Sequence, residues 1–326
     1  MTDISTTSKS TIVRAYRLRH LILTLSEREA PRLGARLAVR MWMTLPASTA
    51  DAGSTAGPGG RGADAAGRGA AGRPPLAAPG DRVVLEAGVV TESWGDGPPV
   101  YLMHGWGGYR GQLSAFVAPL TEAGFRVVAL DAPGHGESGP GMFGRGRALM
   151  PDFINALRAA ITRYGAPHGV VAHSLGASAA AIATLDGLRT SRLVLIAPVS
   201  NVMSGIDIFS RAAGVGPRVR ARMPRRIERI TRMSAGHFDI ALRAAEDDEL
   251  PPALVIHDAG DKRVPFDNGA LVAAAWPDAR LEPTEGLGHL RILRDPAVLG
   301  SVAAFLTGVS PRAAAEADPE ARSALR

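Results

Sequence analysis

The sequence contains no cysteine among its 326 residues, and this absence removes several kinds of chemistry at once. It excludes disulfide bonds, thiolate metal sites and a cysteine nucleophile, and it leaves the redox compartment without a marker. Lysine is almost as scarce, because only Lys9 and Lys262 occur and arginine supplies the other basic residues. Since this preference for arginine is typical of a GC-rich coding bias, the net charge of +6 does not by itself indicate nucleic-acid binding. No nucleic-acid partner is expected.

Long hydrophobic runs are also missing. No stretch of 18 apolar residues exists, and the first 20 residues contain no signal-peptide core before Arg14, Arg17 and Arg19. We therefore expect a soluble, cytoplasmic protein. With 46% hydrophobic and 21% charged residues, the chain has the composition of a globular protein with a sizeable core.

One segment divides the chain by its composition. Residues 47–80 contain 11 Ala, 9 Gly and 4 Pro, and Leu76 is their only large apolar side chain. Such a segment cannot offset the entropy lost on ordering, so it is predicted to be a flexible linker. The linker would separate an N-terminal segment, 1–46, from a domain over 81–308. The tail, 309–326, is Ala-rich and charged and is predicted to be disordered.

The N-terminal segment has the pattern of an amphipathic helix. Residues 26–29 fit a capping box. After it come apolar residues at Leu33, Leu37, Met41 and Trp42, and arginines recur every four residues at Arg28, Arg32, Arg36 and Arg40. Two interpretations are open: a helix that packs on the main domain with a solvated basic face, or a helix that lies on an anionic membrane surface.

Residues 81–308 alternate short apolar runs with helical patterns, which is typical of a parallel sheet covered on both faces. The predicted strands are 83–90 (strand or hairpin), 99–103, 126–130, 169–172, 192–196, 253–256 and 280–282. The predicted helices are 112–123, 151–164, 175–185, 268–275 and 296–305.

The loops that follow these strands carry the chemistry, because ligands of open parallel sheets bind beyond the carboxyl ends of the strands. Residues 170–177 pass from a β-rich run through Ser174 directly into an Ala-rich helix. This strand, sharp turn and helix indicate a nucleophile elbow at Ser174. Gly-rich loops follow the two earlier strands, at 104–108 and 131–138.

With these features the sequence resembles the α/β-hydrolase fold family over nearly all of residues 81–308. The family's elbow is Gly-x-Ser-x-Gly, and here Ala172 takes the place of the first glycine. The resemblance implies a mostly parallel, doubly wound sheet with a helical cap inserted at about residues 200–250. It also implies the chain order nucleophile, acid, histidine. Asp261, just before Val264-Pro265, matches the acid, and His289, in the loop 286–289, matches the histidine.

Other roles also follow from the resemblance. Asp258 is the alternative acid, at a position that in the family more often orders the loop. The backbone N–H groups of Trp106 and Leu175 match the oxyanion hole. His104 and His135 lie in the Gly-rich loops and are predicted to order them, whereas His173 is predicted to line the pocket.

No metal site and no cofactor are expected. The histidines each have another role in this interpretation. The run 134–136 (Gly-His-Gly) lacks the βαβ context and the downstream acid of a dinucleotide fingerprint.

Charge is segregated along the chain. Residues 211–232 carry +7 and the first 43 residues +5, which leaves −6 on the remainder. Within residues 211–232, Pro224 can begin a helix in which Ile227, Ile230 and Met233 have helical spacing. Three interpretations of the basic cap are open: a solvated helix surface, attraction of a substrate with an anionic headgroup or an acyl-thioester carrier, or peripheral contact with an anionic membrane together with the N-terminal helix.

The sequence thus predicts a serine hydrolase that cleaves a small-molecule carboxylic ester through an acyl-enzyme. Thioesterase, acyltransferase and perhydrolase activities use the same triad and stay open as alternatives. So does a non-catalytic binding module that retains the fold.

Overall fold

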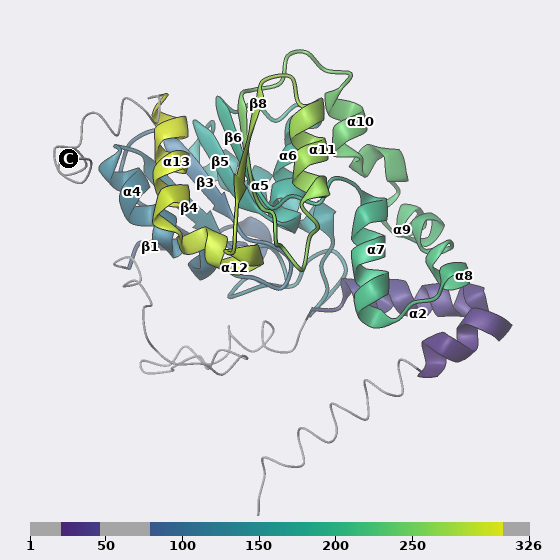
Figure 1. Cartoon of the computed structure of the whole chain (residues 1–326). Coiled ribbons are helices and arrows are strands. Elements are labelled where there is room, and N and C mark those ends of the chain that lie inside the picture. Colours follow the sequence, from purple (N-terminus) through teal and green to yellow (C-terminus); the bar gives the residue numbers. More distant parts are fainter. Residues whose placement is uncertain (1–20, 46–78, 309–326) are drawn as a thin grey trace, which may run out of the picture. The chain divides into compact units, whose positions relative to one another are not determined.

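The computed structural model describes residues 21–45 and 79–308 (Figure 1). The chain divides into two compact units: a smaller one of residues 1–44 and 201–239, and a larger one of residues 45–200 and 240–326. Most of the predicted linker 47–80 and the predicted tail 309–326 lie outside the described residues.

The larger unit is built on one eight-stranded sheet with the order β1-β2-β4-β3-β5-β6-β7-β8. β2 runs antiparallel to its neighbours β1 and β4, and the strands from β4 to β8 pair in parallel. The strands are β1 (Asp81–Val84), β2 (Val90–Trp94), β3 (Pro99–Met103), β4 (Arg126–Leu130), β5 (Gly169–His173), β6 (Arg192–Ile196), β7 (Ala253–Asp258) and β8 (Ala279–Thr284). The predicted doubly wound, mostly parallel sheet is confirmed.

Helices bury both faces of this sheet, which explains why its central strands are continuous apolar runs. Alternate residues of β3 point to opposite faces: Tyr101 and Met103 join one core, and Val100 and Leu102 the other. The first core is completed by α5 (Met150–Tyr164), α6 (Leu175–Leu185), α10 (Ile240–Ala244) and α11 (Asp267–Ala275) (Figure 1). The second is completed by η2 (Arg110–Phe116), α4 (Val117–Glu122), η4 (Ile292–Arg294) and α13 (Pro296–Thr307).

Two predicted elements of the larger unit differ in detail. The predicted helix 112–123 is a 3-10 segment, η2, followed by the short α4. One continuous α-helix would need an N–H donor at Pro119, which proline lacks, and α4 instead begins at Val117 so that Pro119 falls in its first turn. The region predicted as a strand or hairpin over 83–90 is a hairpin of β1 and β2, with η1 (Glu86–Gly88) as its turn.

The smaller unit is helical. Its elements are the helical residues 21–29, α2 (Pro31–Met43), α7 (Val202–Ala213), α8 (Pro217–Arg220), α9 (Met223–Thr231) and η3 (Ala235–Phe238). The helix predicted to open near Pro224 is α9, which has this proline in its first turn.

Two expectations about the N-terminal helix are wrong. Ser26 is not a helix cap: its hydroxyl lies inside the helix of residues 21–29 and donates to the Leu23 carbonyl at 2.9 Å. The next helix, α2, instead starts at Pro31, whose missing N–H is not needed at that position. The buried face of α2 consists of Gly34, Ala35, Ala38, Val39 and Met43, whereas Leu33 is 62% exposed.

The N-terminal helices and the inserted segment belong to the same unit. The Glu27 carboxylate accepts hydrogen bonds from the backbone N–H groups of Arg218 and Val219 at the start of α8, at 2.6 and 2.9 Å. The rings of Trp42 and Phe209 lie 6.3 Å apart. The unit ends at Asp239, short of the expected cap boundary near 250, because Ile240 and the following helix are buried in the core of the larger unit.

None of the helices within residues 21–45 and 79–308 is long and apolar enough to cross a membrane.

Candidate active site

Ser174 lies at the sharp turn between β5 and α6. Its φ of 53° and ψ of −123° place a non-glycine residue in a backbone region that L-residues rarely adopt, which costs about 1–3 kcal/mol. The turn is tied to the sheet because the Ser174 N–H donates to the Ile196 carbonyl at the end of β6, at 2.8 Å. The predicted strand, turn and helix context is therefore present, with the serine at its apex.

The backbone around this turn is crowded. A Cβ at Gly176 would lie 2.2 Å from the His104 carbonyl oxygen, and one at Gly105 would lie 2.8 Å from the Cβ of Ser174. Both positions therefore require glycine. Ala172, where the family has its first glycine, is a fully buried residue of β5, so its methyl group packs within the core.

The side chains of Ser174, His289 and Asp261 form a hydrogen-bonded chain. The His289 Nε2 lies 3.1 Å from the Ser174 Oγ, and the His289 Nδ1 lies 2.7 Å from the Asp261 Oδ2. Asp261 follows β7, and His289 is the second residue of the short α12 (Gly288–Arg291) after β8. The histidine side chain is 8% exposed and the carboxylate is fully buried. Residues more than 100 positions apart are thus brought together at the carboxyl ends of parallel strands.

The surroundings of Asp261 keep its carboxylate ionised. Burial raises the pKa of Asp261, but the hydrogen bond from His289, the charge of that imidazole and the N–H groups of Arg263 and Val264 together hold it below its usual value. An ionised carboxylate can only accept hydrogen bonds, so it holds the proton of His289 on Nδ1. The unprotonated Nε2 then faces the serine hydroxyl.

Asp258, the alternative acid, has a different position. Its carboxylate accepts from the Thr284 hydroxyl at 3.0 Å, the Leu287 N–H at 2.8 Å and the Gly260 N–H at 3.0 Å. Burial raises the pKa of Asp258, but these hydrogen bonds outweigh it and lower the pKa below its usual value. Asp258 therefore holds the loop that leads to His289, whereas Asp261 contacts the imidazole itself.

Two backbone N–H groups have no acceptor among the described residues: that of Leu175, which follows Ser174, and that of Trp106, which follows the Gly105 packed against Ser174. Leu175 is the first residue of α6, where the helix supplies no acceptor for its N–H, and the Trp106 N–H lies in the loop after β3. Neither group donates to another residue in the described part of the chain. The positive end of the α6 dipole also points at this place. Such an arrangement can stabilise a developing oxyanion.

His104 and His135 bind backbone groups with both ring nitrogens. His104 bonds the Gly105 carbonyl through Nδ1 and accepts from the Ala132 N–H through Nε2, while His135 bonds the Pro133 carbonyl and accepts from the Gly107 N–H. Burial, as the largest cause, lowers the pKa of His104 to about 4 and that of His135 to about 3. Both rings are therefore neutral near pH 7 and link the loops after β3 and β4.

His173 is also buried and holds the loop that carries His289. Its Nε2 lies 2.9 Å from the His289 carbonyl oxygen, and the two rings lie 4.6 Å apart. Burial, followed by the nearby His289, lowers the pKa of His173 to about 3, so it donates its proton as a neutral ring. The prediction that it lines a substrate pocket stays a prediction.

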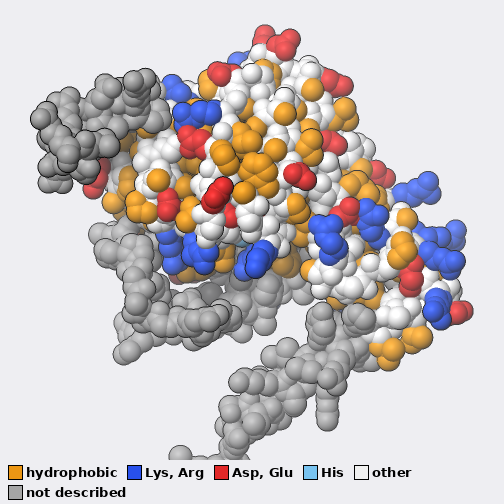
Figure 2. Space-filling view, in the orientation of Figure 1, with side chains coloured by type: hydrophobic (Ala, Val, Ile, Leu, Met, Phe, Trp, Pro, Cys, Tyr) orange, Lys and Arg blue, Asp and Glu red, His pale blue; other side chains and the backbone are white. Residues whose placement is uncertain are grey.

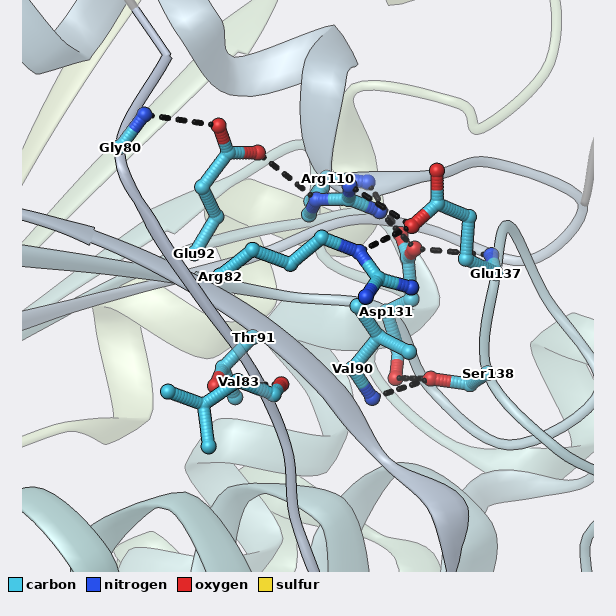
Figure 3. Close-up of polar contacts among 10 residues, drawn as sticks. All are labelled: Gly80, Arg82, Val83, Val90, Thr91, Glu92, Arg110, Asp131, Glu137 and Ser138. Atoms are coloured by element: carbon cyan, nitrogen blue, oxygen red, sulfur yellow. Dashed lines mark hydrogen bonds and ion pairs between the residues drawn. The ribbon is translucent and has the colours of Figure 1, made fainter. Parts of the chain in front are cut away.

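An ion-pair network that the sequence did not reveal supports the loop after β3 (Figure 3). The fully buried Asp131 accepts from the Arg110 backbone N–H at 2.6 Å, from its guanidinium at 2.5 Å and from the Glu137 N–H at 3.0 Å. The Arg110 guanidinium also contacts Glu92 and Glu137, and Arg82 reaches Glu137 from the sheet edge. The position of Asp131 directly after a strand was the one available signal, whereas nothing in the sequence singles out Arg110.

Residues 21–45 and 79–308 contain no group of three or more His, Asp or Glu side chains arranged to hold a metal ion.

Comparisons with known proteins agree with this fold. The serine aminopeptidase S33 family matches residues 98–235. A pimeloyl-[acyl-carrier protein] methyl ester esterase of Methylococcus capsulatus is 51% identical over 51 residues, which are 16% of this chain and 20% of that protein. The chain thus spans only about a fifth of that relative.

Two further matches extend over most of the length of the protein compared. An esterase of the same description from Aromatoleum aromaticum is 26% identical over 61% of this chain and 94% of its own length. The crystal structure of a bromoperoxidase from Bacillus anthracis superimposes with a TM-score of 0.53 at 19% identity, over 70% of this chain and all of the other. The strand order, the elbow and these similarities together show that the chain has the α/β-hydrolase fold.

Proposed function

We propose that this α/β-hydrolase cleaves a carboxylic ester, with Ser174 as nucleophile, His289 as general base and acid, and Asp261 as the orienting acid. The observation that carries the proposal is the hydrogen-bonded chain from Asp261 through His289 to Ser174, with distances of 2.7 and 3.1 Å. In this geometry the imidazole reaches the serine hydroxyl in the tautomer that can take its proton.

The reaction proceeds through an acyl-enzyme. Ser174 Oγ attacks the acyl carbon while its proton passes to His289 Nε2, and the carbonyl oxygen becomes an oxyanion that accepts from the N–H groups of Trp106 and Leu175. The C–O bond to the alcohol then breaks, and the leaving oxygen takes the proton from His289. Water repeats both steps on the acyl-enzyme and releases the carboxylic acid. Each oxyanion donor contributes about 3 kcal/mol of barrier lowering.

The substrate class rests on the relatives. Two of them are described as methyl ester esterases that act on an acyl chain attached to a carrier protein. This supports an ester as the bond that is cleaved. A thioester is the alternative on the same triad, and a matched pair of substrates with one acyl chain, an ester and a thioester, separates the two by kcat/KM.

The direct test is labelling with a fluorophosphonate probe, which reacts only with an activated serine. We expect the wild-type chain to be labelled and Ser174→Ala not to be. Ser178→Ala is the matched control, because that hydroxyl is also in α6 but bonds the Val199 carbonyl at 2.8 Å. Absence of labelling in the folded wild-type chain would favour a binding module that retains the fold.

A further inference from the structure

The smaller unit contains a cavity with an unusual lining. It has a volume of 690 Å³, within the range of about 300–1,000 Å³ found for small-molecule sites. Six arginines line it: Arg32 and Arg36 from α2, and Arg222, Arg225, Arg226 and Arg229 from the segment that begins just before α9 and continues through it. Figure 2 shows Lys and Arg side chains gathered over this unit.

The helix geometry explains why these side chains converge. Arg222, Arg225, Arg226 and Arg229 have the spacing i, i+3, i+4, i+7, which places them on one face of a helix. Met223 and Ile227 occupy the buried side of the same helix. Arg32 and Arg36 are likewise one turn apart on α2, which packs against α9. Two basic faces therefore line one cavity.

Among the described residues, no ion pair joins a carboxylate to any of these six arginines. Within the described part of the smaller unit, Glu27 accepts from backbone N–H groups at the start of α8, and Glu228 accepts from the Ala235 N–H at 2.9 Å. Asp207 forms its ion pair with Arg220, which is outside the cavity lining. None of the six cavity arginines forms an ion pair with an acidic residue of the described chain.

The guanidinium groups around the cavity indicate the chemistry of the ligand that would fit it. Guanidinium groups present planar forks of N–H donors that match phosphate oxygens bidentately, and several of them around one cavity suit a ligand with more than one negative charge. Like charges one turn apart repel one another in the absence of such a ligand. We propose that this arginine cavity binds two or more phosphate groups, carried together by one free polyphosphate or side by side by neighbouring anionic lipid headgroups. The inference goes beyond the ester hydrolysis proposed above and does not depend on Ser174.

The test uses the full chain and two double variants. Arg32→Gln/Arg36→Gln removes two charges inside the cavity. Arg28→Gln/Arg40→Gln removes two charges from the same arginine series, at exposed positions outside the cavity lining, and is the matched control. All four side chains are exposed, so both variants are expected to fold. Binding of inorganic pyrophosphate is measured by calorimetry and by the rise in Tm at 0.15 M salt.

We expect pyrophosphate to bind the wild-type chain and the control variant alike, and the cavity variant to bind at least about tenfold more weakly. Equal weakening in both variants would show that only the overall charge matters and would overturn the proposal. So would the absence of pyrophosphate binding together with the absence of binding to phosphatidylglycerol vesicles.

Vesicle sedimentation distinguishes the two sources. If the phosphate is lipid-borne, the chain sediments with phosphatidylglycerol vesicles and not with phosphatidylcholine vesicles, and pyrophosphate competes. If it is free, pyrophosphate binds and neither vesicle does. Sedimentation that persists unchanged in Arg32→Gln/Arg36→Gln would contradict a role of the cavity in either case.

Discussion

The two units use charged side chains in opposite ways. In the larger unit Arg110 lies among Asp131, Glu92 and Glu137, and the histidines near the serine bond backbone groups with their ring nitrogens. In the smaller unit six arginines line one cavity, and none of them forms an ion pair with an acid of the described residues. Partnered charges fix the geometry of a site before substrate arrives, because their hydrogen bonds are already made. Unpartnered charges cost the free protein stability and gain a function only when an anion binds. Substitution of the charged residues should therefore lower activity or stability in the larger unit, and should leave stability unchanged or raise it in the smaller unit.

The largest expected effect is on the serine itself. Ser174→Ala removes the proposed nucleophile and should lower kcat for a carboxylic ester by about 10⁶-fold. Far-ultraviolet circular dichroism checks that the variant keeps the secondary structure of the wild type. A residual kcat within tenfold of the wild type would show that hydrolysis does not use this residue.

The two buried aspartates near β7 provide a sharper contrast. Asp261→Asn should lower kcat by about 10⁴-fold, because an amide can hold His289 in the wrong tautomer. Asp258→Asn removes a carboxylate that accepts from Thr284, Leu287 and Gly260 and should mainly reduce stability, by about 1–3 kcal/mol, with a much smaller loss of kcat. Steady-state kinetics and urea unfolding of both variants measure the difference. Equal losses of kcat would contradict the assignment of the acid to Asp261.

Substitution of Arg110 tests whether the ion-pair network stabilises the loop after β3. Arg110→Gln leaves the buried Asp131 without its counter-charge and should destabilise the protein by about 3–5 kcal/mol in urea unfolding. Arg82→Gln is the control, because Arg82 is 49% exposed and its pair with Glu137 is worth at most about 1 kcal/mol. If the free energy of unfolding falls equally in both variants, the buried network stabilises the protein no more than the exposed ion pair does.

The neutral histidines make stability depend on pH. The pKa of His104 is about 4 and those of His135 and His173 are about 3, all below the usual 6.5, so the unfolded chain binds more protons between these values. Stability is therefore fully present above pH 6.5 and falls as the pH is lowered. The loss is about 1.4 kcal/mol per histidine for each pH unit. Urea unfolding of the Ser174→Ala chain at pH 7.5 and 5.5 measures it without catalysis, and equal stabilities at the two values would exclude this account.

The same contrast explains what the sequence could predict. Strand, turn and helix patterns predicted the sheet and the position of Ser174 at the turn between a strand and a helix, because these signals are local and periodic. The Arg110 network and the arginine cavity were not foreseen, since Arg110 meets Asp131 and α2 meets α9 only through the tertiary fold. Ser26 shows the opposite error: its motif fits a capping box, but Pro31 a few residues later determines where α2 begins. Local rules fail where a competing residue or a distant partner decides the structure.

The smallest expected effect, a change in stability on substituting two cavity arginines, tests the difference between the two units most directly. Arg32→Gln/Arg36→Gln removes a like-charged pair one turn apart and should leave the ligand-free protein unchanged or more stable, by about 0.2–0.5 kcal/mol. This sign is opposite to that of Arg110→Gln, although both substitutions replace arginine by glutamine. The gain should shrink at high salt, since these side chains are exposed and screened. Added pyrophosphate should reverse the order, because only the wild type then recovers favourable contacts for its guanidinium groups. A loss of stability in the ligand-free variant would mean that these arginines are partnered within the protein, and the two regions would then not differ in kind.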